Sequence, residues 1–131
     1  MKYEICYMVV LTRFPVGHEN NQTYNISQCN NMFIFPGLGF GASTAGAKYV
    51  SDDTLFACSE ALAHSLTDEE IARGQVFPNV DRIREVSCEV AEAVVRNVIK
   101  EGHCRLSQDK IDRLGQFLER KMYNPVYVSL V

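Results

Sequence analysis

The chain has 131 residues, of which 47% are hydrophobic and 22% are charged, and its net charge is −3 at pH 7. This length suits one domain with a moderate core. A slightly acidic balance without a basic cluster argues against nucleic acid as the main partner. No apolar run approaches the ~20 residues that a membrane-spanning helix needs. The composition therefore predicts an ordinary globular protein without a nucleic-acid or membrane partner.

The cysteines show neither metal-site nor disulfide spacing. They are odd in number and widely separated, with no C-x-x-C pair: Cys6, Cys29, Cys58, Cys88 and Cys104. This pattern predicts reduced, mostly buried thiols in an intracellular protein. The apolar start at residues 1–11 is interrupted by Glu4 and is followed by no small-residue cleavage site, so we do not expect a signal peptide.

Two strands are predicted in the first third of the chain. Residues 3–11 are rich in β-forming side chains, whereas residues 12–28 are polar, contain Pro and Gly, and predict a loop. Residues 32–35 are four consecutive apolar residues between an Asn-Asn pair and a Pro-Gly pair. Such a run suits a strand that is buried on both faces of a parallel sheet. The glycine-rich residues 37–46 that follow predict a closely packed helix or turn.

Beyond residue 50 the pattern is helical. Ser51 suits the N-cap of a helix whose apolar stripe comprises Leu55, Cys58, Leu62 and Leu66. Residues 67–70 match a capping box, which predicts a short helix that ends at Gly74.

Two amphipathic helices complete the predicted chain. Residues 81–101 form a long helix, ended by Gly102, with an apolar face of Ile83, Val86, Val90, Val94 and Val98. Residues 107–122 form a last helix that buries Ile111, Leu114 and Leu118.

These elements add up to an incomplete α/β domain, with about two parallel strands followed by four or five helices. Parallel strands need a crossover connection, usually a helix, and the polar residues 12–28 make a poor one. We therefore expect residues 1–131 to be the last part of a larger domain, without a complete second domain.

Asn30 and Asn31 are the first candidate for chemistry. Open α/β sheets bind ligands at one end of their strands, and carboxamides there can donate and accept hydrogen bonds, which suits a small hydroxy- or keto-acid. The simpler interpretation is that they cap a strand or turn.

The glycine run from Gly37 to Ala42 is the second candidate. It fits a G-x-G-x-x-A dinucleotide fingerprint in form, which makes Gly37 and Gly39 weak candidates for cofactor binding. Pro36 stiffens the turn, and no second strand ending in an acid follows about 20 residues later. Packing of a helix against the sheet is therefore the preferred interpretation.

The remaining polar residues predict no catalytic or metal site. His18, His64 and His103 have no metal-ligand spacing, and His103 beside a helix C-terminus suits a favourable cation or a cap. The acidic pairs Asp52-Asp53 and Glu69-Glu70 start helices and complement their dipoles.

One block of the sequence resembles the last conserved block of malic enzymes: Ser27-Gln28-Cys29-Asn30-Asn31-Met32-Phe33-Ile34-Phe35-Pro36-Gly37-Leu38-Gly39. Further motifs of the family follow in order: residues 52–63, 67–70, 76–78, 83–87 and 122–127. The resemblance runs from about Tyr24 to the end. It implies the C-terminal portion of a Rossmann-like NAD(P)-binding domain, possible homo-oligomers, and a place in cytoplasm or mitochondrial matrix.

The resemblance also implies a reaction. Malic enzymes oxidatively decarboxylate malate to pyruvate and carbon dioxide, reducing NAD or NADP with Mg²⁺ or Mn²⁺, and an asparagine in this block contacts malate. Asn30 and Asn31 match that position. The family's catalytic tyrosine and lysine, metal ligands and dinucleotide fingerprint have no counterpart here, so we expect the chain alone to bind no cofactor well and to be inactive.

Two other hypotheses remain open from the sequence. The helical stripes could make the chain a non-catalytic interaction module that docks on a full-length malic enzyme subunit. The run from Gly37 to Ala42 could instead serve a free-standing dinucleotide-binding domain.

Overall fold

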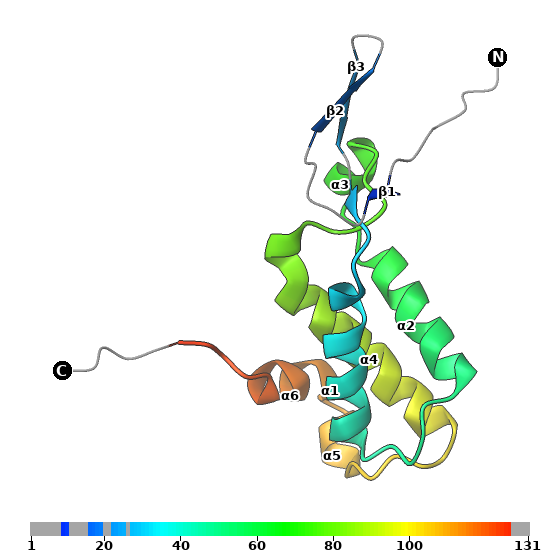
Figure 1. Cartoon of the computed structure of the whole chain (residues 1–131). Coiled ribbons are helices and arrows are strands. Elements are labelled where there is room, and N and C mark those ends of the chain that lie inside the picture. Colours follow the sequence, from blue (N-terminus) through cyan, green and yellow to red (C-terminus); the bar gives the residue numbers. More distant parts are fainter. Residues whose placement is uncertain (1–8, 11–15, 20–21, 26, 127–131) are drawn as a thin grey trace.

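The computed structural model describes residues 9–10, 16–19, 22–25 and 27–126, and side-chain environments from Ser27 onward (Figure 1). The described part is mostly helical. Its α-helices and two short 3₁₀ helices follow four short strands in chain order. The predicted count of two strands is therefore not confirmed, and the helices exceed the four or five expected.

The strands form two separate two-stranded sheets. β1 (Val9–Val10) pairs in parallel with β4 (Ser27–Gln28). β2 (Val16–Glu19) and β3 (Gln22–Asn25) form an antiparallel hairpin, which projects from one end of the helical body in Figure 1.

A strand within residues 3–11 is confirmed at β1, while residues 3–8 and 11 lie outside the described part. The loop predicted over residues 12–28 is wrong at β2, β3 and β4. The sequence did not reveal these strands, because their mostly polar residues show little apolar alternation.

The strand predicted at residues 32–35 is wrong. Residues Asn31–Phe33 form a 3₁₀ helix, η1, and α1 (Phe35–Ala45) follows at once. Phe33 is fully buried but Phe35 is 63% exposed, so the run is not buried on both faces. Pro36 lies in the first turn of α1, where its missing N–H costs nothing. The Pro-Gly pair therefore begins a helix instead of ending a strand.

α1 packs closely against α4 (Ile83–Lys100) through glycines. A Cβ atom at Gly37 would lie 2.6 Å from Val90 Cβ, and one at Gly41 would lie 2.7 Å from the Ala91 carbonyl oxygen. The absence of side chains lets the two backbones approach. The closely packed helix predicted for residues 37–46 is confirmed, but its partner is a helix and not the sheet.

α2 (Asp52–His64) begins where predicted, since Ser51 Oγ accepts a hydrogen bond from Thr54 N at 3.1 Å. Its predicted stripe is half right. Cys58 and Leu62 are buried, but Leu55 is 46% exposed, and Leu66 lies beyond the end of the helix. Thr54, one helical turn before Cys58, is buried in place of Leu55. Its hydroxyl can be buried because it is hydrogen-bonded.

The short helix α3 (Asp68–Ala72) has the predicted capping box at Thr67 and Glu70. A second 3₁₀ helix, η2 (Val80–Arg82), leads directly into α4. The predicted face of α4 is confirmed at its four valines, which are fully buried: Val86, Val90, Val94 and Val98. Ile83 at its start is partly buried.

The single helix predicted over residues 107–122 is wrong. Arg113, with φ −123° and ψ 35°, leaves the helical region and separates α5 (Gln108–Ile111) from α6 (Leu114–Lys121). Leu114 and Leu118 are buried as predicted, whereas Ile111 is only partly buried.

α4 is the centre of the core. It packs against α1, α2 and α6 (Figure 1). The segment after α4 holds the C-terminal end of α1, because Arg105 N donates to the Ala45 carbonyl oxygen at 2.8 Å. None of the helices in the described ranges has the length and apolar character to cross a membrane.

Candidate functional site

Asn30 and Asn31 lie just past the carboxyl end of β4 and at the start of η1. The strand predicted after them does not exist, yet they still follow a parallel strand, where open α/β sheets bind ligands. Asn30 is partly buried and Asn31 is exposed. The sequence therefore placed the pair before a strand that does not form, whereas in the structure it follows β4, a strand that the sequence did not predict.

The Asn30 side chain has a structural task. Its Oδ1 accepts a hydrogen bond from Met32 N at 3.0 Å and so caps η1. Capping uses only the oxygen of the amide. Within residues 27–126, neither the Nδ2 group of Asn30 nor the side chain of Asn31 has a hydrogen-bond partner. Both groups can therefore donate to a carboxylate or hydroxyl of a ligand.

The connection between α3 and η2 contacts the chain on both sides of this pair. Ser27, which is 4% exposed, accepts a hydrogen bond at its Oγ from Val76 N at 2.9 Å. The rings of Phe33 and Phe77 lie 5.9 Å apart between centroids. Ser27 and Val76 are far apart in sequence, so no local pattern could have identified Ser27.

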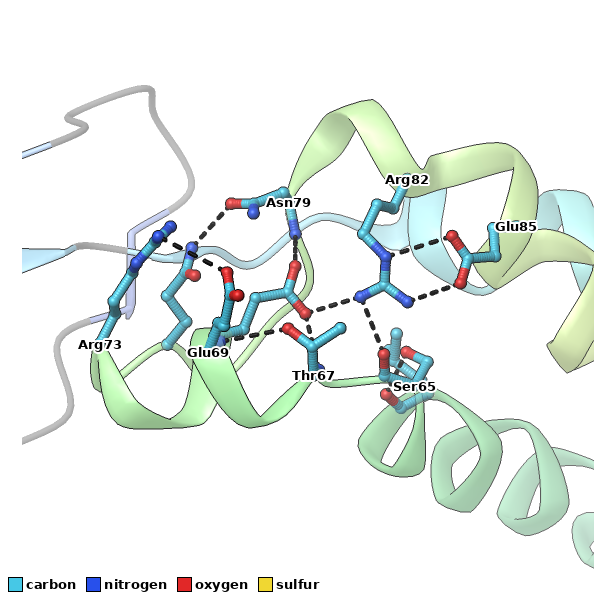
Figure 2. Close-up of polar contacts among 10 residues, drawn as sticks. Ser65, Thr67, Glu69, Arg73, Asn79, Arg82 and Glu85 are labelled. Atoms are coloured by element: carbon cyan, nitrogen blue, oxygen red, sulfur yellow. Dashed lines mark hydrogen bonds and ion pairs between the residues drawn. The ribbon is translucent and has the colours of Figure 1, made fainter.

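A buried ion pair lies at the base of the same connection (Figure 2). The Glu70 side chain is 2% exposed, and its carboxylate accepts from Arg82 at 2.7 Å, from Asn79 N at 2.8 Å and from Thr67 N at 2.9 Å. Burial alone would raise the pKa of Glu70. The hydrogen bonds from the Thr67 and Asn79 backbones, with the charge of Arg82, outweigh burial and lower that pKa.

Arg82 joins three elements. Besides Glu70, its guanidinium donates to the Ser65 carbonyl oxygen at 3.0 Å and to Glu85 at 2.8 Å (Figure 2). The sequence predicted Glu70 as a helix-start residue, which is confirmed, but missed its ion pair with a residue twelve positions away.

A second polar cluster joins the end of α4 to the start of α2. Glu101 accepts hydrogen bonds from Ser51 Oγ, from Asn97 Nδ2 at 2.9 Å and from His103 Nε2 at 2.8 Å. The hydrogen bond from Ser51, followed by that from His103, lowers the pKa of Glu101.

His103 is 8% exposed and does more than cap a helix. Its Nδ1 accepts from Lys48 N at 3.4 Å, and its ring stacks on Tyr49 with centroids 4.5 Å apart. Since Nδ1 accepts, the proton of the neutral ring lies on Nε2, facing Glu101. The histidine predicted to act at the helix end is thus held in a polar network.

The other sequence candidates lie apart from the Asn pair. Gly37 faces α4, so close packing of the two helices explains this glycine. A Cβ at the exposed Gly39 would meet nothing within 4 Å. His18 belongs to β2, and the exposed His64 ends α2.

The cysteines are free where the structure describes them. Of the four in the described part, only Cys58 is fully buried, so the expectation of mostly buried thiols is wrong: Cys29, Cys88 and Cys104 are partly exposed. Burial raises the pKa of Cys58 and of Cys88. Cys6 lies outside the described residues. No three His, Cys, Asp or Glu side chains in the described ranges gather closely enough to hold a metal ion.

Comparison with known proteins identifies the family. A family model described as the NAD binding domain of malic enzyme matches residues 12–99, which include the Asn pair and the Glu70–Arg82 ion pair. The chain belongs to the malic enzyme family.

Malic enzymes of plants and bacteria align over most of this chain. A mitochondrial NAD-dependent malic enzyme of Solanum tuberosum is 37% identical over 121 residues, covering 86% of this chain and 19% of its own length. NADP-dependent malic enzyme 2 of Arabidopsis thaliana is 41% identical over 113 residues, with the same coverage of 86% and 19%. The NAD-dependent malic enzyme of Shewanella woodyi is 38% identical over 108 residues, covering 82% and 19%. The chain thus spans about a fifth of the length of these relatives.

Proposed function

We propose that this chain is the C-terminal portion of the Rossmann-like NAD(P)-binding domain of a malic enzyme. The complete enzyme would oxidatively decarboxylate (S)-malate to pyruvate and carbon dioxide and reduce NAD or NADP. The family match and the parallel pairing of β1 with β4 support this assignment. The observation that carries the site is the position of Asn30 and Asn31 beyond the carboxyl end of β4.

In this proposal the two asparagines form one wall of the malate site. Asn30 uses Oδ1 to cap η1, so its Nδ2 group donates to a carboxylate or hydroxyl of malate. Asn31 is exposed and adds a second amide beside it. A hydrogen bond to a charged group contributes about 1.5–3 kcal/mol, which makes either contact large enough to measure.

The chain alone would lack activity. The family's divalent metal, Mg²⁺ or Mn²⁺, would supply charge stabilisation, but the described residues gather no metal-binding cluster. The glycine run that could have served NAD or NADP packs on α4 at Gly37 and Gly41. We assign cofactor and metal binding to the rest of a complete enzyme, a homo-oligomer located in cytoplasm or mitochondrial matrix.

The first test is an activity assay. The purified 131-residue chain should show no malate-dependent reduction of NAD or NADP with Mg²⁺ or Mn²⁺ present. Metal-dependent turnover above background would overturn the proposal that the chain is incomplete.

The second test isolates the malate contact. This chain would replace the aligned segment of the Solanum tuberosum enzyme, and Asn30→Asp would be compared with the unchanged chimera. Asp keeps an acceptor for Met32 N but loses the donor group and adds a negative charge. We expect the KM for malate to rise by about 10- to 100-fold, since each tenfold corresponds to about 1.4 kcal/mol.

The control is Asn124→Asp, the same change at an exposed asparagine near the end of the described part. It should leave the KM for malate unchanged. An Asn30→Asp chimera with the KM of the unchanged chimera, together with an equally unaffected Asn31→Ala chimera, would refute the proposed substrate contacts.

Exposed apolar side chains favour a second candidate function, that of an interaction module docking on a malic enzyme subunit. On α2, Leu55 is 46% and Phe56 is 69% exposed. The module would bind a hydrophobic dye when alone and lose that binding on adding a malic enzyme subunit. A compact, cooperatively folding monomer that binds no dye would contradict it.

A further inference from the structure

We propose that the Glu70–Arg82 ion pair is a positioning device for Asn30 and Asn31. It fixes the shape of the connection between α3 and η2, and that connection holds the chain on both sides of the asparagines. The inference rests on the proposed malate contact for its functional meaning, but its structural basis is independent of malate.

The ion pair joins both ends of the connection. The Glu70 carboxylate binds Thr67 N before α3, and also Asn79 N at 2.8 Å, just before η2. Gln75 N donates to the Glu70 carbonyl oxygen at 3.0 Å. Arg82 then supplies the positive charge that a carboxylate with 2% exposure requires. Residues 70–79 are therefore closed into a loop by one side chain.

This loop contacts the asparagine segment at two points. Val76 N donates to Ser27 Oγ at 2.9 Å, three residues before Asn30. The Phe77 ring lies against Phe33, two residues after Asn31 and fully buried. The loop therefore holds the asparagine pair from both sides, and the Glu70–Arg82 pair in turn holds the loop.

The asparagines need this support because their own segment offers little. β4 has two residues, η1 has three, and the Asn30 cap is a single hydrogen bond of 3.0 Å. Binding groups must be held within about 0.5 Å of their productive geometry, and neighbouring residues usually provide that precision. Val76 and Phe77 are two neighbours that can provide it here, and both belong to the loop.

Amide hydrogen exchange measured by NMR on the full chain tests this inference. Met32 N–H reports the Asn30 cap, and Val76 N–H reports the contact with Ser27. Glu70→Gln removes the charge and keeps the size of the side chain. We expect the protection factors of Met32 and Val76 to fall at least about tenfold, while amides in the middle of α4, such as Val94, keep theirs.

The matched control is Glu69→Gln. Glu69 is the adjacent residue, and its 84%-exposed side chain lies 3.8 Å from Arg73. The substitution removes the same charge from the same short helix, and it should leave the protection of Met32 and Val76 unchanged. If Glu70→Gln lowers the protection factor of Val76 but leaves that of Met32 unchanged, the ion pair stabilises only its own loop and the inference is wrong.

A second variant keeps the inference testable if Glu70→Gln unfolds the chain. Ser27→Ala removes only the Ser27–Val76 hydrogen bond. It should lower the protection of Met32 and shift the Nδ2 signals of Asn30, while Asn79 N–H, held by Glu70, stays protected. Unchanged Met32 and Asn30 signals in Ser27→Ala would overturn the proposal. The exchange pattern needs no malate, so its failure differs from a failure of the Asn30→Asp chimera.

Discussion

Glu70 shows how a single charged residue can be buried without becoming neutral. Three donors surround its carboxylate, and two of them are backbone N–H groups that cannot turn away: those of Thr67 and Asn79. The third is Arg82, which keeps 21% of its side chain exposed. These donors are held in place around the carboxylate, so they favour the ionised form and outweigh the effect of burial. The pKa of Glu70 is therefore lowered.

This lowered pKa predicts how stability depends on pH. A carboxyl group with a lower pKa in the folded than in the unfolded chain stabilises the fold fully above the unfolded pKa. That contribution is lost as the pH falls through the folded pKa, below the usual range for Glu. The free energy of unfolding measured with urea should therefore fall between about pH 5 and about pH 2, in part through Glu70.

Glu70→Gln should remove that part of the pH dependence. At about pH 7 it should also lower the free energy of unfolding by about 3 kcal/mol, because Arg82 loses its buried partner. Glu69→Gln, at an exposed position, should change it by less than about 0.5 kcal/mol. Equal losses in the two variants would show that the burial of Glu70 has no energetic role.

At the scale of elements, the contact between α1 and α4 depends on missing side chains. A Cβ at Gly41 would lie 2.7 Å from the Ala91 carbonyl oxygen and 2.8 Å from Val94 Cβ. Neither neighbour can move easily, because one is a backbone carbonyl oxygen of a helix and the other is a Cβ atom bonded directly to that backbone. Gly39 lies on the same helix and faces open space.

The two glycines should therefore respond oppositely to the same substitution. Gly41→Ala should lower the free energy of unfolding by about 1–3 kcal/mol through overpacking. Gly39→Ala should raise it by about 0.5–1 kcal/mol, because Ala favours helix more than Gly. Thermal or urea unfolding checks both. Equal free energies of unfolding for Gly41→Ala and Gly39→Ala would contradict the close approach of α1 to α4 at Gly41.

The elements that the sequence predicted well are those with local signals. The Ser51 cap, the Thr67–Glu70 capping box and the valine face of α4 each depend on residues within one or two helical turns. Residues 32–35 failed because four apolar residues fit a buried strand or a buried helix start equally well. Only the packing of Gly37 and Gly41 against α4 decides between them.

The candidate site was predictable only in part. Asn30 and Asn31 stood out because they belong to a specific block of the family. Their position after β4 was not predicted, because residues 12–28 were expected to form a loop. Their supports did not stand out. Ser27 meets Val76 and Glu70 meets Arg82 across turns and loops, and such contacts between distant residues leave no periodic trace in one sequence.

At the scale of the whole molecule, α4 is anchored at both ends. Arg82 at its start binds Glu70 and Ser65, and Glu101 at its end binds Ser51 and His103. The segment after α4 also holds the end of α1 through Arg105. Residues 101–105 therefore hold both the end of α1 and the start of α2, although the family model matches only residues 12–99.

A chain that ends at residue 99 should be much less stable than the full chain. It would lose Glu101, His103 and Arg105 together with the buried Leu114 and Leu118 of α6. Removing even one buried Leu side chain costs about 2–5 kcal/mol, which is a large part of the total for a domain. Circular dichroism during thermal unfolding should show loss of the cooperative transition. An unchanged transition would mean that the folding unit ends at α4.

The cap at Asn30 couples ligand and backbone through one small group. The oxygen of the amide holds Met32 N, while the nitrogen of the same amide can donate to a ligand. Donation from the nitrogen shifts electron density toward the oxygen, and hydrogen bonds linked in this way strengthen one another. An acceptor bound at Nδ2 would therefore tighten the first turn of η1, and the chain leading into α1 would sense an occupied site without any side chain changing its rotamer.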